Sequence, residues 1–259
     1  MNRRTLLSSG LASAIASSAR AADTTHIGVQ LYTVRTLLER DYDGTLAKIA
    51  ALGYREVEFG GMECPAAMLK RHGLTAPSGH APFERLERDL PKVLAEAKAR
   101  EQRYIVCPFI DESRRRTLDD WKRLVALFNI VGEQAQRAGL AFAYHNHDFE
   151  FQTVEGELPY AFLLANTDPA LVNMELDLYW MARAGHDPLA WFQRHPGRFP
   201  LLHLKDRARD GTIADVGSGT INFRRILAAG SWTHAFVEHD DPADPLKSLT
   251  ASLANLKKL

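Results

Sequence analysis

Short apolar runs alternate with amphipathic stretches from about residue 27 to the C-terminus. The apolar runs are continuous rather than alternating with polar residues, which is typical of parallel strands buried on both faces. The stretches between them carry apolar residues at helical spacing, most clearly at 117–138. We expect strands at 27–31, 55–59, 74–78, 103–108, 140–144, 172–178, 200–204 and 235–238. We expect helices at 44–52, 65–72, 86–100, 117–138, 160–166, 188–194, 223–229 and 245–256.

Eight β-α units in a chain of this length predict an α/β protein with a single (β/α)8 TIM barrel. An open doubly wound sheet is the alternative. Its phosphate-binding turn would follow the first strand, whereas the one G-x-G of the chain, Gly217-Ser218-Gly219, falls late, before 223–229, and is expected to be a plain loop turn. No linker or low-complexity segment divides the chain, so residues 22–259 are expected to form one domain.

Residues 1–21 are expected to be a signal peptide that is cleaved. Arg3-Arg4 precede a short apolar stretch, and Ala19-Arg20-Ala21 has the small-residue pattern of a cleavage site. The apolar part is shorter than the ~20 residues needed to span a bilayer, so no membrane anchor is expected. The paired arginines resemble a twin-arginine signal, with the general secretory route as the alternative. Both routes predict a periplasmic protein.

The charge of the chain is balanced. It carries 32 Lys and Arg against 32 Asp and Glu, with 46% hydrophobic and 25% charged residues. This composition is that of an ordinary globular protein, without the basic surplus that nucleic-acid binding requires. We therefore expect a small-molecule partner, while the oligomeric state stays open, a homo-oligomer included.

The ends of the predicted strands are polar. In a parallel barrel these ends meet at one mouth, where functional residues lie. Asp177, His203 and Glu238 each end an apolar run, and carboxylates with an imidazole suit a hard or borderline divalent cation. Carboxylates facing the interior would be costly unless they met a cation, so we expect a metal site. The other polar residues at these strand ends are Gln30, Glu58, His80, His145, His147, Glu175 and Lys205.

Five segments carry a resemblance to a known family: residues 28–35 (GVQLYTVR), 144–151 (YHNHDFEF), 175–180 (ELDLYW), 203–206 (HLKD) and 237–238 (VE). They resemble the xylose isomerase-like TIM barrels described as sugar phosphate isomerases/epimerases, over essentially all of residues 22–259. In related ketose epimerases a Glu, an Asp, a His and a Glu after four successive strands hold the metal. Asp177, His203 and Glu238 match the last three. The first place falls at Tyr144 or His145, so we predict Glu150 as the fourth ligand, with His145 as the alternative.

The resemblance implies an isomerase or epimerase of a keto-sugar that uses Mn²⁺, Zn²⁺, Co²⁺ or Mg²⁺ and an enediolate intermediate. Glu238 would be both ligand and base, and His145 or His147 the second acid/base group. Lys205, Glu58 and His80 would position hydroxyl groups, and Gln30 would also contact the substrate. No other cofactor is expected.

Three alternatives stay open. The same enolate could expel a β-substituent, which would make the protein a periplasmic 3-keto-glycoside lyase or hydrolase with the same residues. A phosphodiesterase would need more metal ligands and a basic groove. A non-catalytic sugar-binding protein would have no need for the Asp177, His203 and Glu238 set. The loop after 235–238 has no cluster of Arg or Lys, so a sugar without phosphate is favoured.

Overall fold

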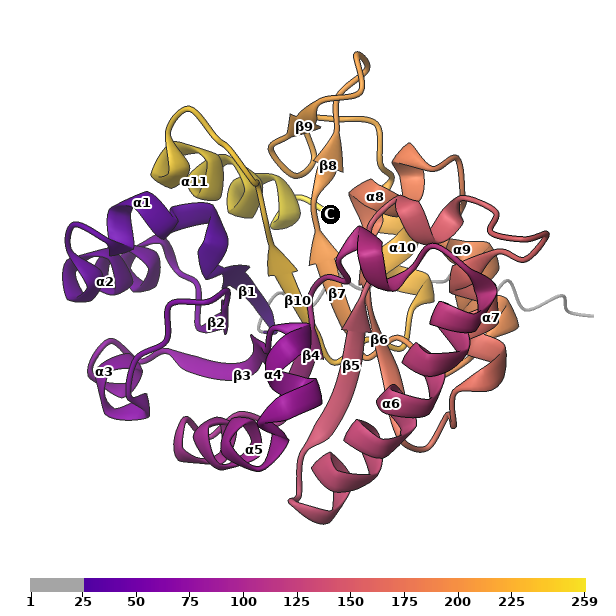
Figure 1. Cartoon of the computed structure of the whole chain (residues 1–259). Helices are drawn as coiled ribbons and strands as arrows, with labels where there is room; N and C mark the ends of the chain where they lie inside the picture. Colours follow the sequence, from indigo (N-terminus) through magenta and orange to yellow (C-terminus); the bar gives the residue numbers. More distant parts are fainter. Residues whose placement is uncertain (1–25) are drawn as a thin grey trace, which may run out of the picture.

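The computed structural model describes residues 26–259, and these form a closed barrel of eight parallel strands. The strands follow the order β1, β10, β7, β6, β5, β4, β3, β2 around the barrel. The first and last barrel strands in the chain, β1 and β10, pair with each other and close it. Helices surround the barrel (Figure 1). The predicted (β/α)8 barrel is therefore confirmed. The predicted signal peptide at 1–21 lies outside the described residues, among which no helix is long and apolar enough to cross a membrane.

The barrel strands are β1 (Ile27–Gln30), β2 (Glu56–Phe59), β3 (Thr75–His80), β4 (Tyr104–Cys107), β5 (Ala141–His145), β6 (Val172–Asp177), β7 (Leu201–Leu204) and β10 (His234–Val237). The helices are α1 (Arg35–Leu38), α2 (Tyr42–Leu52), α3 (Ala66–Arg71), α4 (Phe83–Arg88), α5 (Leu90–Ala99), α6 (Leu118–Arg137), α7 (Pro159–Asn166), α8 (Leu178–Arg183), α9 (Pro188–Arg194), α10 (Phe223–Ala229) and α11 (Pro245–Leu256). Three 3-10 turns complete them: η1 (Leu31–Val34), η2 (Glu112–Arg114) and η3 (Phe149–Phe151).

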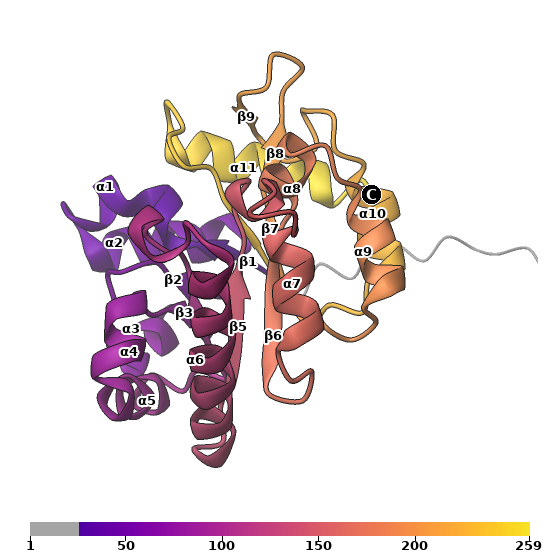
Figure 2. The same ribbon diagram turned by 45° about the vertical axis from the view of Figure 1, so that its right-hand side comes forward.

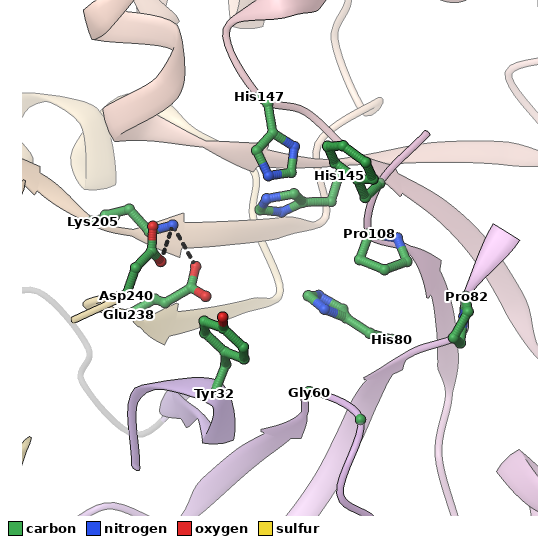
Figure 3. A pocket seen from close by; sticks show the side chains of 12 residues that line it. Tyr32, Gly60, His80, Pro82, Pro108, His145, His147, Lys205, Glu238 and Asp240 are labelled. Carbon is green, nitrogen blue, oxygen red and sulfur yellow. Dashed lines mark ion pairs between the residues drawn. The ribbon is translucent and has the colours of Figure 1, made fainter. Parts of the chain in front are cut away.

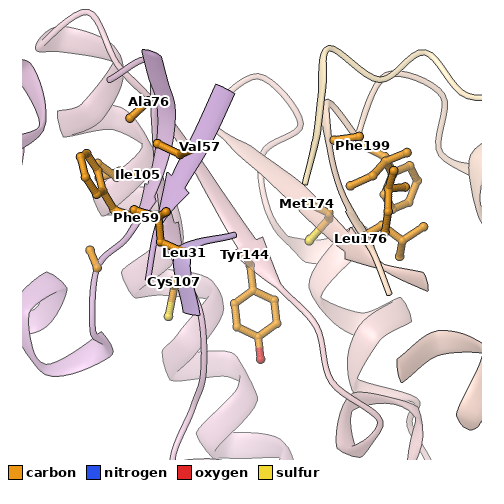
Figure 4. Close-up of a cluster of buried hydrophobic side chains, with 14 of the residues drawn as sticks. Leu31, Val57, Phe59, Ala76, Ile105, Cys107, Tyr144, Met174, Leu176 and Phe199 are labelled. Carbon is orange, nitrogen blue, oxygen red and sulfur yellow. The ribbon is translucent and has the colours of Figure 1, made fainter. Parts of the chain in front are cut away.

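The strands alternate between two cores because successive side chains of a strand point to opposite faces. On β5, Phe142 and Tyr144 belong to the large core between the strands and the helices, part of which is drawn in Figure 4. Ala143 belongs instead to a small cluster inside the barrel, with Val106, Leu201 and Phe236. His145 has the same parity as Ala143 and therefore faces the interior at the carboxyl end of the strand.

Besides the short α1, which was not predicted, two helices differ from the prediction. The helix expected at 86–100 is divided into α4 and α5, because Pro91 has no N–H to donate to the carbonyl of Glu87, and Asp89 leaves helical geometry with φ −141°. The second difference is α8, which begins directly after β6 and was not predicted. Asp177 caps it, since Oδ1 accepts from Trp180 N at 2.8 Å.

The segment after β7 forms a small antiparallel hairpin, β8 (Asp206–Arg207) with β9 (Ile213–Ala214), which extends beyond the end of β7 (Figure 2). The buried Asp206 carboxylate accepts from the backbone N–H groups of Gly217, Gly219 and Ile221 at 2.8–3.1 Å. A Cβ on Gly219 would lie 2.4 Å from the Arg207 carbonyl oxygen. The glycines therefore let this loop fold onto Asp206, which explains the G-S-G as a structural turn.

Candidate functional site

Three of the four predicted metal ligands lie together at the mouth of the barrel. Asp177 ends β6, His203 lies in β7 and Glu238 follows β10, and these strands are neighbours in the order β6, β7, β10. Asp177 and His203 are register partners, and all three residues are buried. One ligand atom from each lies within 4.8 Å of the others. The structure thus brings together on adjacent strands three residues that are far apart in the sequence.

Asp177 is held in one orientation. Its Oδ1 caps α8, and its backbone N–H donates to Asn146 Oδ1 at 3.1 Å. Among the described residues Oδ2 has no hydrogen-bond donor, and its ion-pair neighbour is Lys205 Nζ at 3.3 Å. Burial raises the pKa of Asp177 to about 6, although Lys205 opposes this shift. A carboxylate oxygen kept free in this way, beside an imidazole and a second carboxylate, fits a hard or borderline divalent cation.

Lys205 is buried among carboxylates. Its Nζ lies 2.7 Å from Asp240 Oδ1, 2.9 Å from Glu238 Oε2 and 3.3 Å from Asp177 Oδ2. Burial lowers the pKa of an ammonium, but these three carboxylates outweigh it and hold the pKa of Lys205 above its usual value. Lys205 is therefore charged and fixed at the mouth.

Below the mouth, a second layer of side chains forms one hydrogen-bonded network around two buried carboxylates. Glu58 Oε2 lies 2.7 Å from Gln30 Nε2 and 2.6 Å from His203 Nε2. Glu175 Oε2 lies 3.1–3.2 Å from a ring nitrogen of each of three histidines, namely His80, His145 and His203. His203 joins the layers, because its Nδ1 lies 2.8 Å from Glu238 Oε2.

The four histidines of the mouth divide into two charge states. Burial lowers the pKa of His80 and His203, but the neighbouring glutamates raise it to about 9 for His80 and well above the usual value for His203. Burial lowers the pKa of His147 to about 3 and that of His145 well below its usual value, and the positive charges nearby add to both shifts. At neutral pH, His145 and His147 are therefore the uncharged imidazoles of the site.

Glu150 does not lie with the predicted ligands. It is in η3, where Oε1 accepts from Tyr144 OH at 2.5 Å and Oε2 from the His147 backbone N–H at 2.9 Å. Because Tyr144 points outward from β5 into the helix-facing core, this bond draws Glu150 away from the barrel interior. His145, the alternative ligand, lies closer, with Nε2 3.9 Å from Asp177 Oδ2. The geometry thus separates Glu150 from the cluster of Asp177, His203 and Glu238 and leaves His145 beside it.

The buried Glu150 carboxyl is expected to make the stability of the fold depend on pH. Burial raises its pKa to about 8, so the folded state binds a proton that the unfolded chain has released. Stability is therefore fully present below the ordinary pKa of a glutamate and falls as pH rises towards 8, by on the order of 2 kcal/mol between pH 5 and 7. We expect Glu150→Gln to remove this slope. Urea unfolding of both proteins across this range measures it; the exposed Glu39→Gln is the control, and an unchanged slope in Glu150→Gln would contradict the assignment.

A cavity of about 410 Å³ opens over these residues. Figure 3 shows Lys205, Glu238 and Asp240 on one side of it and His80 on the other, with His145 and His147 between them. Tyr32 and Phe109 also line the cavity, and both rings are unusually exposed for large apolar side chains, at 42% and 45%. The site therefore offers charged groups on one wall, neutral imidazoles on another and aromatic surfaces at the entrance.

Several residues of this site had no expected function from the sequence. Glu175 was expected only as a polar residue at a strand end, because its place among three histidines depends on neighbouring strands. The sequence does indicate Asp240 as a candidate site residue, because it belongs to a run of four polar residues that begins at Glu238, directly after an apolar strand. Phe109 carried no chemical signal, because its role depends on the course of the loop after β4.

Comparison with known proteins gives relatives and structural neighbours. No family model matches the chain. The inosose dehydratase of Lacticaseibacillus casei is 29% identical over 137 residues, which are 46% of this chain and 45% of that protein. The inosose dehydratase of Clostridium tetani is 28% identical over 127 residues, 49% of this chain and 41% of that protein. Each match thus spans less than half the length of the relative.

The structural neighbours cover nearly the whole chain. A sugar phosphate isomerase/epimerase from Parabacteroides distasonis has a TM-score of 0.77 and 28% identity, covering 93% of this chain and 96% of that one. The 3-keto-D-glucoside 4-epimerase of E. coli has a TM-score of 0.70 at 18% identity, covering 91% and 100%, and shows the fold alone. The fold is therefore that of the xylose isomerase-like TIM barrels, and the relatives and neighbours described above bear the names of sugar-modifying enzymes.

Proposed function

We propose that this protein is a divalent-metal-dependent enzyme that removes and returns a proton at the carbon next to the carbonyl group of a keto-sugar, so that the sugar is isomerised or epimerised. The observation that carries the proposal is the convergence of Asp177, His203 and Glu238 at the mouth, where Glu238 lines a cavity that two neutral imidazoles, His145 and His147, also line. The names of the relatives and neighbours support the choice of a sugar as substrate.

Asp177, His203 and Glu238 would hold the metal once His203 has released a ring proton, with His145, whose Nε2 lies 3.9 Å from Asp177 Oδ2, as a further donor. When bound, a divalent cation supplies a Lewis acid that polarises the substrate carbonyl and lowers the barrier to losing the adjacent proton. Burial raises the pKa of Glu238, but Lys205 and His203 outweigh it and keep this carboxylate ionised, so that it can accept the proton. His145 and His147 are neutral and can accept a hydrogen bond from a substrate hydroxyl, whereas the second acid/base role expected of them would need a pKa nearer 7 than burial leaves them.

The cavity suits a sugar without a phosphate group. Among the described residues, Lys205 is the one lysine or arginine that lines it, and this ammonium is already paired with three carboxylates. His80, the other cationic group of this lining, is paired with Glu58 and Glu175, so a phosphate would meet only cations that carboxylates already neutralise. Tyr32 and Phe109 instead offer ring faces against which the C–H surface of a sugar can pack.

Elimination is the second candidate. The similarity to inosose dehydratases favours it, because a dehydratase removes water and that reaction can start from the same proton removal. A 3-keto-glycoside would lose its aglycone in the same way. Every residue named above serves both outcomes, and what differs is the group at the β-carbon.

The experiment is proton exchange followed by NMR in D₂O. Metal-loaded protein is given a panel of keto-sugars and inososes, including 3-keto-glucosides. Deuterium entering the α-carbon with the β-substituent retained supports isomerisation or epimerisation, and loss of water or aglycone supports elimination. If no substrate shows exchange that a chelator abolishes, the proposal is wrong.

We also propose that the enzyme is periplasmic, because residues 1–21 are expected to be a signal peptide. Cell fractionation of the source organism, with Arg3→Lys and Arg4→Lys together in one variant, tests this location. Twin-arginine export predicts that the variant stays in the cytoplasm.

A further inference from the structure

Three metal-ligating side chains also meet at the opposite end of the barrel, where the strands begin. His26 immediately precedes β1, Glu56 is the first residue of β2 and His234 is the first residue of β10. These strands are neighbours, because β1 pairs with both β10 and β2. One ligand atom from each residue lies within 4.8 Å of the other two. The cluster shares no residue with the mouth.

Both imidazoles lie within hydrogen-bonding distance of the same carboxylate. His234 Nδ1 lies 2.7 Å from Glu56 Oε2, and His26 Nδ1 lies 3.3 Å from Glu56 Oε1. The backbone holds this arrangement, since Ala235 N donates to the His26 carbonyl at 3.1 Å and Gly28 is the register partner of Glu56. Two nitrogens and two oxygens therefore converge from three strands whose relative positions the barrel fixes.

The cluster is partly buried and partly open. Glu56 and His234 are 8% and 5% exposed, whereas the His26 side chain is 55% exposed. All three line a cavity of about 280 Å³ that leaves room for water or a small ligand. Among the described residues His234 Nε2 has no hydrogen-bond partner, so nothing on that side fixes the tautomer, and the ring can carry its proton on Nε2 and offer the lone pair of Nδ1 to a metal.

We propose that His26, Glu56 and His234 bind a zinc ion. Two imidazoles and one glutamate are a familiar zinc donor set, and water from the cavity would complete a tetrahedron. Arg100 and Arg103 also line the cavity, and their charge opposes cations that bind by electrostatic attraction alone. Coordination by nitrogen therefore selects Zn²⁺ over Mg²⁺ or Ca²⁺.

The zinc ion would link the two ends of the barrel sequence. His26 belongs to the first barrel strand and His234 to the last, and the β1–β10 pairing closes the barrel. An ion bound here favours the folded state, because the unfolded chain does not bring these residues together. Its role is thus structural and does not depend on the function proposed for the mouth.

The test counts zinc ions. The untagged full chain is stripped with a chelator, titrated with Zn²⁺ against a competing chromogenic chelator, and its thermal unfolding is followed with and without the metal. We expect the wild-type protein to bind one more Zn²⁺ than His26→Ala, and to gain a Zn²⁺-dependent rise in Tm that His26→Ala lacks. Mg²⁺ and Ca²⁺ should give no such difference between the two proteins.

Two further variants make the result decisive. Glu56→Gln keeps a hydrogen-bonding side chain and should lose the same ion as His26→Ala. His72→Ala is the matched control, because His72 Nε2 lies 2.9 Å from Asp43 Oδ1 in a surface pair outside these clusters, and it should keep the wild-type number of ions. If His26→Ala or Glu56→Gln folds and binds as many Zn²⁺ ions as the wild-type protein, the cluster is only hydrogen-bonded and the proposal is overturned.

Discussion

Replacing Glu238 by glutamine is expected to slow α-proton exchange by about 10³-fold, the scale on which a positioned acid/base group acts. The amide cannot accept a proton at neutral pH, and it weakens metal binding as well. Folding should survive, because Lys205 keeps Asp177 and Asp240 as partners after the change. The measurement is the exchange rate in D₂O at a metal concentration that saturates the variant.

Saturation with metal separates the two roles of Glu238. If excess metal restores wild-type exchange, Glu238 is a ligand and not the base, and the proposed mechanism fails in that part. If exchange remains low although the metal is bound, the role of base is supported. Glu39→Gln changes an exposed glutamate of the same size and should leave the rate unaltered.

Replacing Lys205 by methionine is expected to destabilise the fold by about 3–5 kcal/mol near pH 8, because it leaves buried carboxylates without their cation. The penalty should shrink near pH 5.5. Asp177 already has a raised pKa of about 6, and without Lys205 this pKa rises further. A raised carboxyl pKa favours the folded state at low pH and destabilises it as pH rises, so protonation relieves the variant. Urea unfolding at the two pH values measures both effects.

A divalent cation gives the same variant a second test. Because Asp177 would lose its closest cation and Glu238 would keep only His203, Mn²⁺ or Zn²⁺ should stabilise Lys205→Met more than the wild-type protein. Lys247→Met is the control, since Lys247 forms an exposed pair with Asp244 at 3.4 Å and its loss should change stability by less than about 0.5 kcal/mol. An equal loss in both variants would show that the pairs at the mouth contribute nothing to stability.

The strand pattern determined the barrel itself, because continuous apolar runs separated by amphipathic helices have few other ways to bury both faces of a sheet. Strand ends then predicted the mouth, since parallel strands place their carboxyl ends on one side. This reasoning was sufficient to bring Asp177, His203 and Glu238 together before their distances were known. The pattern of apolar residues did not predict the break at Asp89, where α4 ends and α5 begins, because a single proline and the local backbone angles cause it.

Only the tertiary structure decided which polar residues meet. Glu150 follows β5 as closely as a ligand would, yet its bond to the outward-facing Tyr144 separates it from the metal-ligating cluster. Asp240 meets Lys205, and Glu175 meets three histidines, through contacts between strands that are distant in the sequence. His26 and His234 lie 208 positions apart, near opposite ends of the chain, and touch one carboxylate because the barrel closes there. The sequence determines where each strand lies and which of its side chains share a face. The register between strands and the closure of the barrel then set the distances between the side chains, on which the chemistry depends.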